Sequence, residues 1–458
     1  MRRLNTVVVL VLAAANAFGG GDTKLHEAAH QDALDTARQL LDDGADASAA
    51  NDYGVTPAYL ACINRSYEMA GTLLRAGADP NAATWSGESV LMACSRTGAV
   101  AAVKILLDSG ADVTAAEGRR GQTALMWAAA GAHSEVVQVL IEGGAEVTTR
   151  SAEGFTPLLF AARSGDVESA RVLLDAGADP DESTTRHGNS LVVAAAGGHE
   201  SLALYLLERG ADPDAVDENG ITALHHAVSR GMAALNGVRY DPVYRLLPDN
   251  MHALAAALLE AGADPDRQIL NAARLGPDGS PFEMEGTTPF LLASISADVR
   301  LMRLLRAHGA NPTLVAKGGT TALIAAARAA CTGACAFKGG NQANDADIKR
   351  AYDAVAAIIA MDVDLNASND DGQTAMHMAA FTGADPIVSL LAENGAAVNV
   401  VDHYGQTPWS MASGISPVLR YRGLYGDHVT TAALLETLGA TRVSRDTMDP
   451  DAPPPPGQ

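Results

Sequence analysis

The chain is short of aromatic residues and of positive charge. Phe, Tyr and Trp make up only 4% of its 458 residues, so a core must be closed with Leu, Val and Ala. Such a core suits thin, closely stacked layers better than one deep globular centre. Lys and Arg number 32 against 54 acidic residues, a net charge of −22. We therefore expect no nucleic-acid partner and no adhesion to anionic membranes, because both need a basic surface.

Long apolar runs are also scarce, and a short one lies near the start of the chain. Residues 7–15 are apolar, follow Arg2 and Arg3, and precede a small-x-small sequence at 15–17. This is the layout of a secretory signal peptide, and the run is about half the length of a membrane span. We interpret 1–17 as a signal peptide, with an internal first helix as the alternative. The chain is then exported, periplasmic or secreted, without stable membrane insertion after signal removal, and its 27 Arg against 5 Lys indicate a bacterial source.

Self-similarity is what the sequence has in abundance. A Thr or Ser two residues after a Gly recurs, mostly every 32–34 residues, and a Gly-Ala-Asp-like turn follows each after two apolar stretches of helical spacing. Thr156 suits a helix N-cap, Pro157 the first helical position, and Gly177 a left-handed helix end. The recurring residues are Thr23, Thr56, Ser89, Thr123, Thr156, Ser190, Thr222, Thr288, Thr321, Thr374 and Thr407.

These motifs resemble the ankyrin repeat, which starts Thr-Pro-Leu-His-x-Ala-Ala and ends Gly-Ala-Asp. GQTALMWAAA at 121–130 and GFTPLLFAAR at 154–163 are especially close to that pattern. The resemblance covers residues 22–440. It implies an all-α solenoid of about eleven helix-turn-helix repeats with β-hairpin or loop connections, in which neighbouring repeats complete each other's core.

Departures from the repeat length predict insertions. They fall near 232–250, 266–284, 331–348 and 412–428. We interpret the long step from Thr222 to Thr288 as one repeat with two insertions, since only one second-helix ending lies in that span. The tail at 446–458 is polar and rich in Pro, so we expect it to be disordered.

Catalysis finds no support in the sequence, which lacks GxSxG, HExxH, P-loop and dinucleotide-binding motifs. The resemblance implies structural hydrogen bonding for His26, His225 and His377, and His133 and His199 begin second helices. Acidic pairs recur in the loops without the order of a calcium-binding loop. We therefore predict a protein that is not an enzyme and needs neither cofactor nor metal.

The four cysteines form two pairs. Cys62 and Cys94 lie in the first helices of adjacent repeats, where we expect buried free thiols, with a bridge between repeats as the alternative. Cys331 and Cys335 lie in an insertion whose Gly333 would let a loop close. For that pair we predict a disulfide, given an oxidising compartment.

The candidate binding residues follow from the resemblance, which places first helices and hairpin tips on a concave binding face. Trp127 and Phe160 occupy the fifth position of the first helix, where we expect an exposed apolar stripe bordered by Arg96 and Arg163. The alternative is that these side chains merely pack along the stack. Four further residues are predicted at hairpin tips, where exposure can also be incidental: Tyr53, Trp85, Arg119 and Tyr404.

The insertions offer a rival surface, since Tyr240, Tyr244, Arg420 and Tyr421 gather Arg and Tyr in an acidic chain. They could equally pack a long loop onto the outer helices. Our leading interpretation is an exported scaffold that binds a partner protein of unknown identity through the concave face. The alternatives are a small-molecule or glycan binder using the insertions, and a secreted effector or toxin subunit.

Overall fold

The structure is a computed structural model that describes residues 23–229, 250–271, 285–330, 345–415 and 428–449. The chain divides into two compact units, Met1–Ala211 (unit one) and Asp212–Gln458 (unit two), which are described separately. Several predictions fall outside the described residues. These are the signal peptide at 1–17, the Cys331–Cys335 disulfide, and the surface formed by Tyr240, Tyr244, Arg420 and Tyr421.

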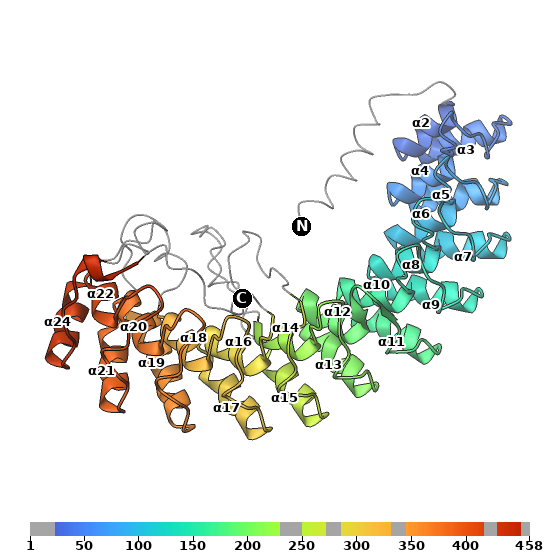
Figure 1. Cartoon of the computed structure of the whole chain (residues 1–458). Coiled ribbons are helices and arrows are strands. Elements are labelled where there is room, and N and C mark those ends of the chain that lie inside the picture. Colours follow the sequence, from blue (N-terminus) through green and yellow to red (C-terminus); the bar gives the residue numbers. More distant parts are fainter. Residues whose placement is uncertain (1–22, 230–249, 272–284, 331–344, 416–427, 450–458) are drawn as a thin grey trace. The chain divides into compact units, whose positions relative to one another are not determined.

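Helices in sequential pairs make up the described part of both units, 22 in all, which confirms the predicted all-α array. In unit one, first helices pack against first helices and second helices against second helices (Figure 1). The pairs are α2 (Lys24–His30) with α3 (Leu34–Asp42), α4 (Pro57–Ile63) with α5 (Tyr67–Arg75), α6 (Val90–Thr97) with α7 (Val100–Asp108), α8 (Ala124–Ala130) with α9 (Ser134–Glu142), α10 (Pro157–Ser164) with α11 (Val167–Asp175), and α12 (Ser190–Gly197) with α13 (Glu200–Glu208).

Unit two continues the same pattern with helix pairs of less regular length. The pairs are α14 (Ala223–Ser229) with α15 (His252–Glu260), α16 (Pro289–Ile295) with α17 (Val299–Ala307), α18 (Ala322–Arg328) with α19 (Asp345–Ile359), α20 (Ala375–Thr382) with α21 (Asp385–Glu393), and α22 (Pro408–Ala412) with α24 (Val429–Thr437). Helix α14 packs against both α15 and α16. No helix pair therefore separates α14 from α16 in the described part of unit two.

Each repeat is bounded by residues whose local chemistry starts or ends a helix. The Thr156 hydroxyl accepts the N–H of Leu159, and Pro157 fills the first position of α10. Gly177 then ends the pair at φ +94°. One predicted cap differs: α12 is capped by Asn189, which accepts the N–H of Val192, because that helix begins one residue early, at Ser190 itself.

The core lies between the two helix layers and depends on small side chains. Ala161 and Ala162 of α10 are fully buried, as are the larger Leu158 of α10 and Leu173 of α11. Because alanine adds so little width, successive first helices can approach closely, which is how a chain with few aromatic residues fills its interior.

Loops joining the repeats are hydrogen-bonded to one another at their tips. In unit one the backbone N–H of Trp85 donates to the Tyr53 carbonyl (3.0 Å), and that of Gly118 donates to the Ser86 carbonyl (2.9 Å). The N–H of Ala152 likewise donates to the Arg120 carbonyl (2.7 Å). We call this series the loop-tip ladder. In the last loop of unit one, β1 (Ser183–Thr184) pairs antiparallel with β2 (Gly188–Asn189), with Thr184 opposite Gly188.

Residues 446–449, expected to be disordered, instead close the array of unit two. A 3₁₀ turn, η2 (Arg445–Thr447), begins after Ser444, whose side chain accepts the N–H of Asp446. Met448 is buried, and the N–H of Asp449 donates to the Tyr404 carbonyl (3.1 Å), as in the loop-tip ladder. The prediction was wrong here because one apolar side chain suffices to dock a short polar segment. The rest of the tail, 450–458, lies outside the described residues.

Cys62 and Cys94 form a disulfide, which corrects the expectation of free thiols. The stacking of α4 on α6 brings their Cα atoms to 4.7 Å, within the range a disulfide spans. Both residues are fully buried, and the bridge ties two consecutive repeats of unit one together.

Candidate protein-interaction surface

Buried histidines hold the repeats together, as the resemblance implied. In His225, Nδ1 accepts the N–H of Thr222 (3.1 Å), so the proton lies on Nε2, which donates to the Arg267 carbonyl (3.0 Å). Burial lowers the pKa of His225 to about 3. His26 and His377 make the same pair of contacts, with Thr23 and Val55 and with Thr374 and Gln406. The ring nitrogens of these three histidines thus make hydrogen bonds within the array, which is a structural role.

Arg96 and Trp127 form a stacked pair on the side of the first helices. The Arg96 guanidinium lies 4.7 Å from the centroid of the Trp127 ring and forms an ion pair with Glu88 at 3.0 Å. The same Glu88 carboxylate acts on Tyr59: burial raises the pKa of Tyr59, and Glu88 raises it further. The Trp127 ring is half-buried beneath Arg96, and the charge of Arg96 is matched by Glu88.

Phe160 is only 3% exposed, so the expectation that it forms an exposed patch with Trp127 is wrong. Its ring packs against Phe155, with centroids 5.5 Å apart, and beneath the Arg163 guanidinium at 4.8 Å. Burial lowers the pKa of Arg163; the Glu153 carboxylate opposes that shift and the Arg120 guanidinium adds to it. Arg163 itself remains exposed above the two rings.

The apolar stripe expected at the fifth position of the first helices is mostly covered. Phe160, Leu292 and Met411 are buried there, and only a minority of the equivalent side chains are even half-exposed, Trp127 among them. The fifth position lies beside the loops and the neighbouring repeat. Large side chains there therefore add to the core.

Exposed aromatic side chains lie instead at the loop tips. The exposed fraction is 84% for Trp85 and 51% for Tyr53, and the ladder bond joins the two backbones. Arg119 and Arg120, both exposed, occupy the tip of the following loop. We call Tyr53, Trp85, Arg119 and Arg120 the loop-tip surface. Arg120 escaped our sequence reasoning, although a pair of arginines beside a glycine turn was visible.

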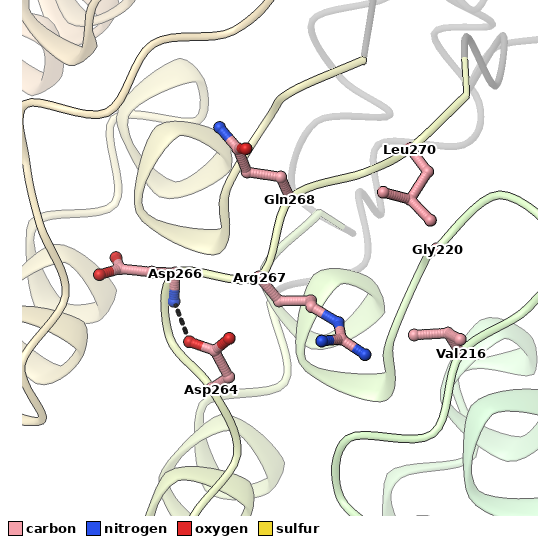
Figure 2. A pocket seen from close by; sticks show the side chains of 7 residues that line it. All are labelled: Val216, Gly220, Asp264, Asp266, Arg267, Gln268 and Leu270. Carbon is pink, nitrogen blue, oxygen red and sulfur yellow. Dashed lines mark hydrogen bonds between the residues drawn. The ribbon is translucent and has the colours of Figure 1, made fainter.

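Unit two contains a small pocket between consecutive loops, with a volume of about 320 Å³. Figure 2 shows Arg267 reaching toward Val216, with Leu270 above them near Gly220. Asp264 is occupied in holding its own loop, because it accepts the N–H of Asp266 (2.9 Å). The pocket is lined by Val216, Gly220, Asp264, Asp266, Arg267, Gln268 and Leu270.

The described residues contain neither a membrane-spanning helix nor a cluster of metal ligands. Among them, no helix has the length and apolar character that crossing a membrane requires. The same residues contain no group of three or more His, Cys, Asp or Glu side chains placed to hold a metal ion.

Comparisons with known proteins agree with this architecture. Residues 3–84, 25–117, 90–184 and 346–421 match a family model described as ankyrin repeats in three copies, and residues 191–238 match one of ankyrin repeats in many copies. The chain is also 28% identical, over 229 residues, to the E3 ubiquitin-protein ligase KEG of Arabidopsis thaliana. That match covers 45% of this chain and only 12% of the plant protein.

Proposed function

Because the chain belongs to the ankyrin-repeat family, whose arrays are protein-interaction scaffolds, we propose that it binds a partner protein through the loop-tip surface of unit one. The exposure of Trp85 carries this proposal. A tryptophan with 84% of its surface in water is a large apolar group that gains free energy when a partner covers it. The ladder bond to Tyr53 holds its backbone in place before a partner arrives.

The loop tips replace the Trp127 and Phe160 patch as the proposed contact surface. Phe160 is buried, and Trp127 lies beneath an arginine that already has an acidic partner. A partner could reach Phe160 only if that side chain first became exposed, and it could cover Trp127 only in part. Tyr53 and Trp85 need no such rearrangement, so little of the binding free energy is lost in exposing them.

Export of the chain is part of the proposal. It is supported by the buried Cys62–Cys94 disulfide, since such bonds form and persist mainly in oxidising compartments. The apolar run at 7–15 supplies the signal. Fractionation of cells that produce the full chain, beside a form lacking residues 2–17, should find only the full chain outside the cytoplasm. Equal distribution of the two forms would contradict export.

No catalytic step is included in the proposed function. The name of the plant protein describes a ligase, but the match covers too little of that protein for its activity to be carried over. An array of this kind contributes a binding surface, and any chemistry would belong to the partner.

Binding through the loop tips is tested with a double variant, Tyr53→Ser with Trp85→Ser. Cross-linked affinity capture with the tagged chain should recover a partner that the variant loses. Val401→Ser is the matched control, because Val401 is 58% exposed on a loop of unit two. Capture unchanged in the double variant would move the contact surface elsewhere.

A small ligand is the second candidate, and the pocket of unit two favours it. Its volume of about 320 Å³ lies at the lower end of ligand sites, and Arg267 offers a charged donor beside the apolar Val216 and Leu270. A screen of small carboxylates by thermal shift, with Arg267→Ala as the comparison, tests it. A ligand that stabilises both forms equally would exclude this pocket.

A further inference from the structure

Three arginines of unit one lie exposed on the side of the loops and first helices. Arg119 and Arg120 are at the tip of the loop before α8, and Arg163 is in the last turn of α10. None of the three forms an ion pair within the described residues. By contrast, Arg38 and Arg171 on the second helices are paired with Glu68 and Glu168.

Glu117, the acidic residue nearest the two loop arginines in sequence, binds their backbone. Glu117 is buried, and its carboxylate accepts the backbone N–H of Arg119 and of Arg120, each at 2.7 Å. The carboxylate thus fixes the loop through its backbone and leaves both guanidinium groups to the solvent. A preformed loop presents them at little entropic cost.

Arg163 extends the same basic surface toward the helices. Its guanidinium lies over the rings of Phe155 (5.4 Å) and Phe160 (4.8 Å), and Arg120 is close enough to act on it electrostatically. The carboxylate that acts on it electrostatically is that of Glu153. A guanidinium stacked on aromatic rings keeps N–H donors for a carboxylate, and the rings limit its movement.

Aromatic and basic side chains follow one another along the loop-tip ladder. Tyr53 and Trp85 are on neighbouring tips, and the tip with Arg119 and Arg120 is bonded to the Trp85 loop through Gly118 and Ser86. An extended segment crossing these loops would meet two apolar rings and then a run of positive charge. In a chain with a net charge of −22, this basic stretch is local.

We infer that the partner presents an extended acidic segment, whose carboxylates bind Arg119, Arg120 and Arg163 and whose apolar side chains cover Trp85 and Tyr53. This inference rests on the proposed function and names the chemistry of the partner. Charge complementarity at the arginines selects acidic segments, and the acidic remainder of the chain repels other acidic surfaces. The two effects together give the segment one preferred place to dock.

The test uses the full chain and two labelled peptides of equal length, repeats of Glu-Leu-Glu-Pro and of Gln-Leu-Gln-Pro. The acidic peptide should bind at low salt and weaken as salt rises, while the amide peptide binds at least about tenfold more weakly. Arg119→Glu with Arg120→Glu should weaken the acidic peptide by about tenfold or more. Arg300→Glu with Arg303→Glu, on the exposed side of α17, makes the same charge change and should have little effect.

Several results would overturn the inference. Equal affinity for both peptides, equal loss in the two double variants, or no binding of the acidic peptide at low salt would each do so. Partner capture separates this failure from that of the proposed function. Suppose that capture is lost in the Tyr53 and Trp85 variant but kept in the Arg119 and Arg120 variant. This result would support the proposed scaffold function and contradict the acidic segment.

Discussion

The backbone N–H of Trp85 donates to the carbonyl of Tyr53 across 3.0 Å, so aromatic side chains 32 positions apart in sequence are neighbours. The bond joins the backbones of the two loops, so each loop is held by its neighbour. The exposed rings are therefore held on a rigid backbone, which reduces the conformational entropy lost when they bind.

Trp85→Ala should leave folding almost unchanged. The side chain is 84% exposed, so its removal deletes little buried surface, and we expect the free energy of unfolding to change by less than about 0.5 kcal/mol. Urea denaturation followed by circular dichroism measures this. A loss of several kcal/mol would mean that Trp85 packs against the protein in solution.

Phe160→Ala should do the opposite. Phe160 is buried against Phe155 and beneath Arg163, and truncating such a ring lowers the free energy of unfolding by about 3–5 kcal/mol. The same denaturation experiment tests the change, with Trp85→Ala as its matched control. A neutral effect would return Phe160 to the exposed surface predicted from the sequence.

Reducing the Cys62–Cys94 disulfide should destabilise unit one. Its closure of a loop with a sequence separation of 32 predicts a loss of about 2–4 kcal/mol. The melting temperature of the oxidised chain should fall when dithiothreitol is added. The double variant Cys62→Ala with Cys94→Ala should melt low with and without reductant. Equal melting temperatures of the natural chain and the double variant without reductant would contradict a stabilising disulfide.

Acid should weaken unit two through His225. Burial lowers the pKa of His225 in the folded chain to about 3, whereas the ordinary value is 6.5. The unfolded chain thus takes up the proton first, so the stabilisation is complete above about pH 6.5 and is lost as pH falls toward 3. Each such histidine contributes a slope of up to about 1.4 kcal/mol per pH unit.

Fluorescence of Trp409, which lies in unit two, can follow this effect in a chain carrying Trp85→Phe and Trp127→Phe. The measurement is the difference in slope, between pH 7 and 5, when His225→Gln is added. The neighbouring His226, whose burial lowers its pKa to about 4, is kept in both chains. Parallel slopes would rule out His225 as the source.

Replacing Asp449 by proline should loosen the end of unit two. The change removes the only N–H by which Asp449 can donate to the Tyr404 carbonyl, while buried Met448 is retained. Hydrogen exchange should then speed up in α24, with α16 as an internal reference. Unchanged exchange in α24 would show that Met448 alone holds the segment.

Local chemistry was readable from the sequence, because a cap or a left-handed turn depends on a few adjacent residues. Thr156, Pro157 and Gly177 occupy the helix-start and helix-end positions that the motif predicts. Where Asp362 stands at the usual glycine position, it adopts the same left-handed backbone, φ +57°. Repetition of such signals predicted the fold.

The site was harder to predict, because burial depends on partners far away in sequence. The covering of Trp127, for example, comes from Arg96 in the previous repeat. Counting helical positions places these side chains on a face but does not show what lies over them. The disulfide has the same origin, since only the stacking of α4 on α6 brings Cys62 to Cys94.

Backbone bonds like those of the loop-tip ladder also join the loops of unit two, and they explain how that unit accommodates extra sequence. Leu270 donates to Asn219 on one side, and Glu285 accepts from Lys317 on the other, so the two bonds are made by residues that flank 272–284. Ile269 is also bonded to Gly286 and Thr287, which closes the neck between the flanks. These bonds between the two flanks keep the neighbouring loops in the same alignment on both sides of 272–284. A segment of another length or sequence at 272–284 should therefore leave the bonded loops on either side unchanged.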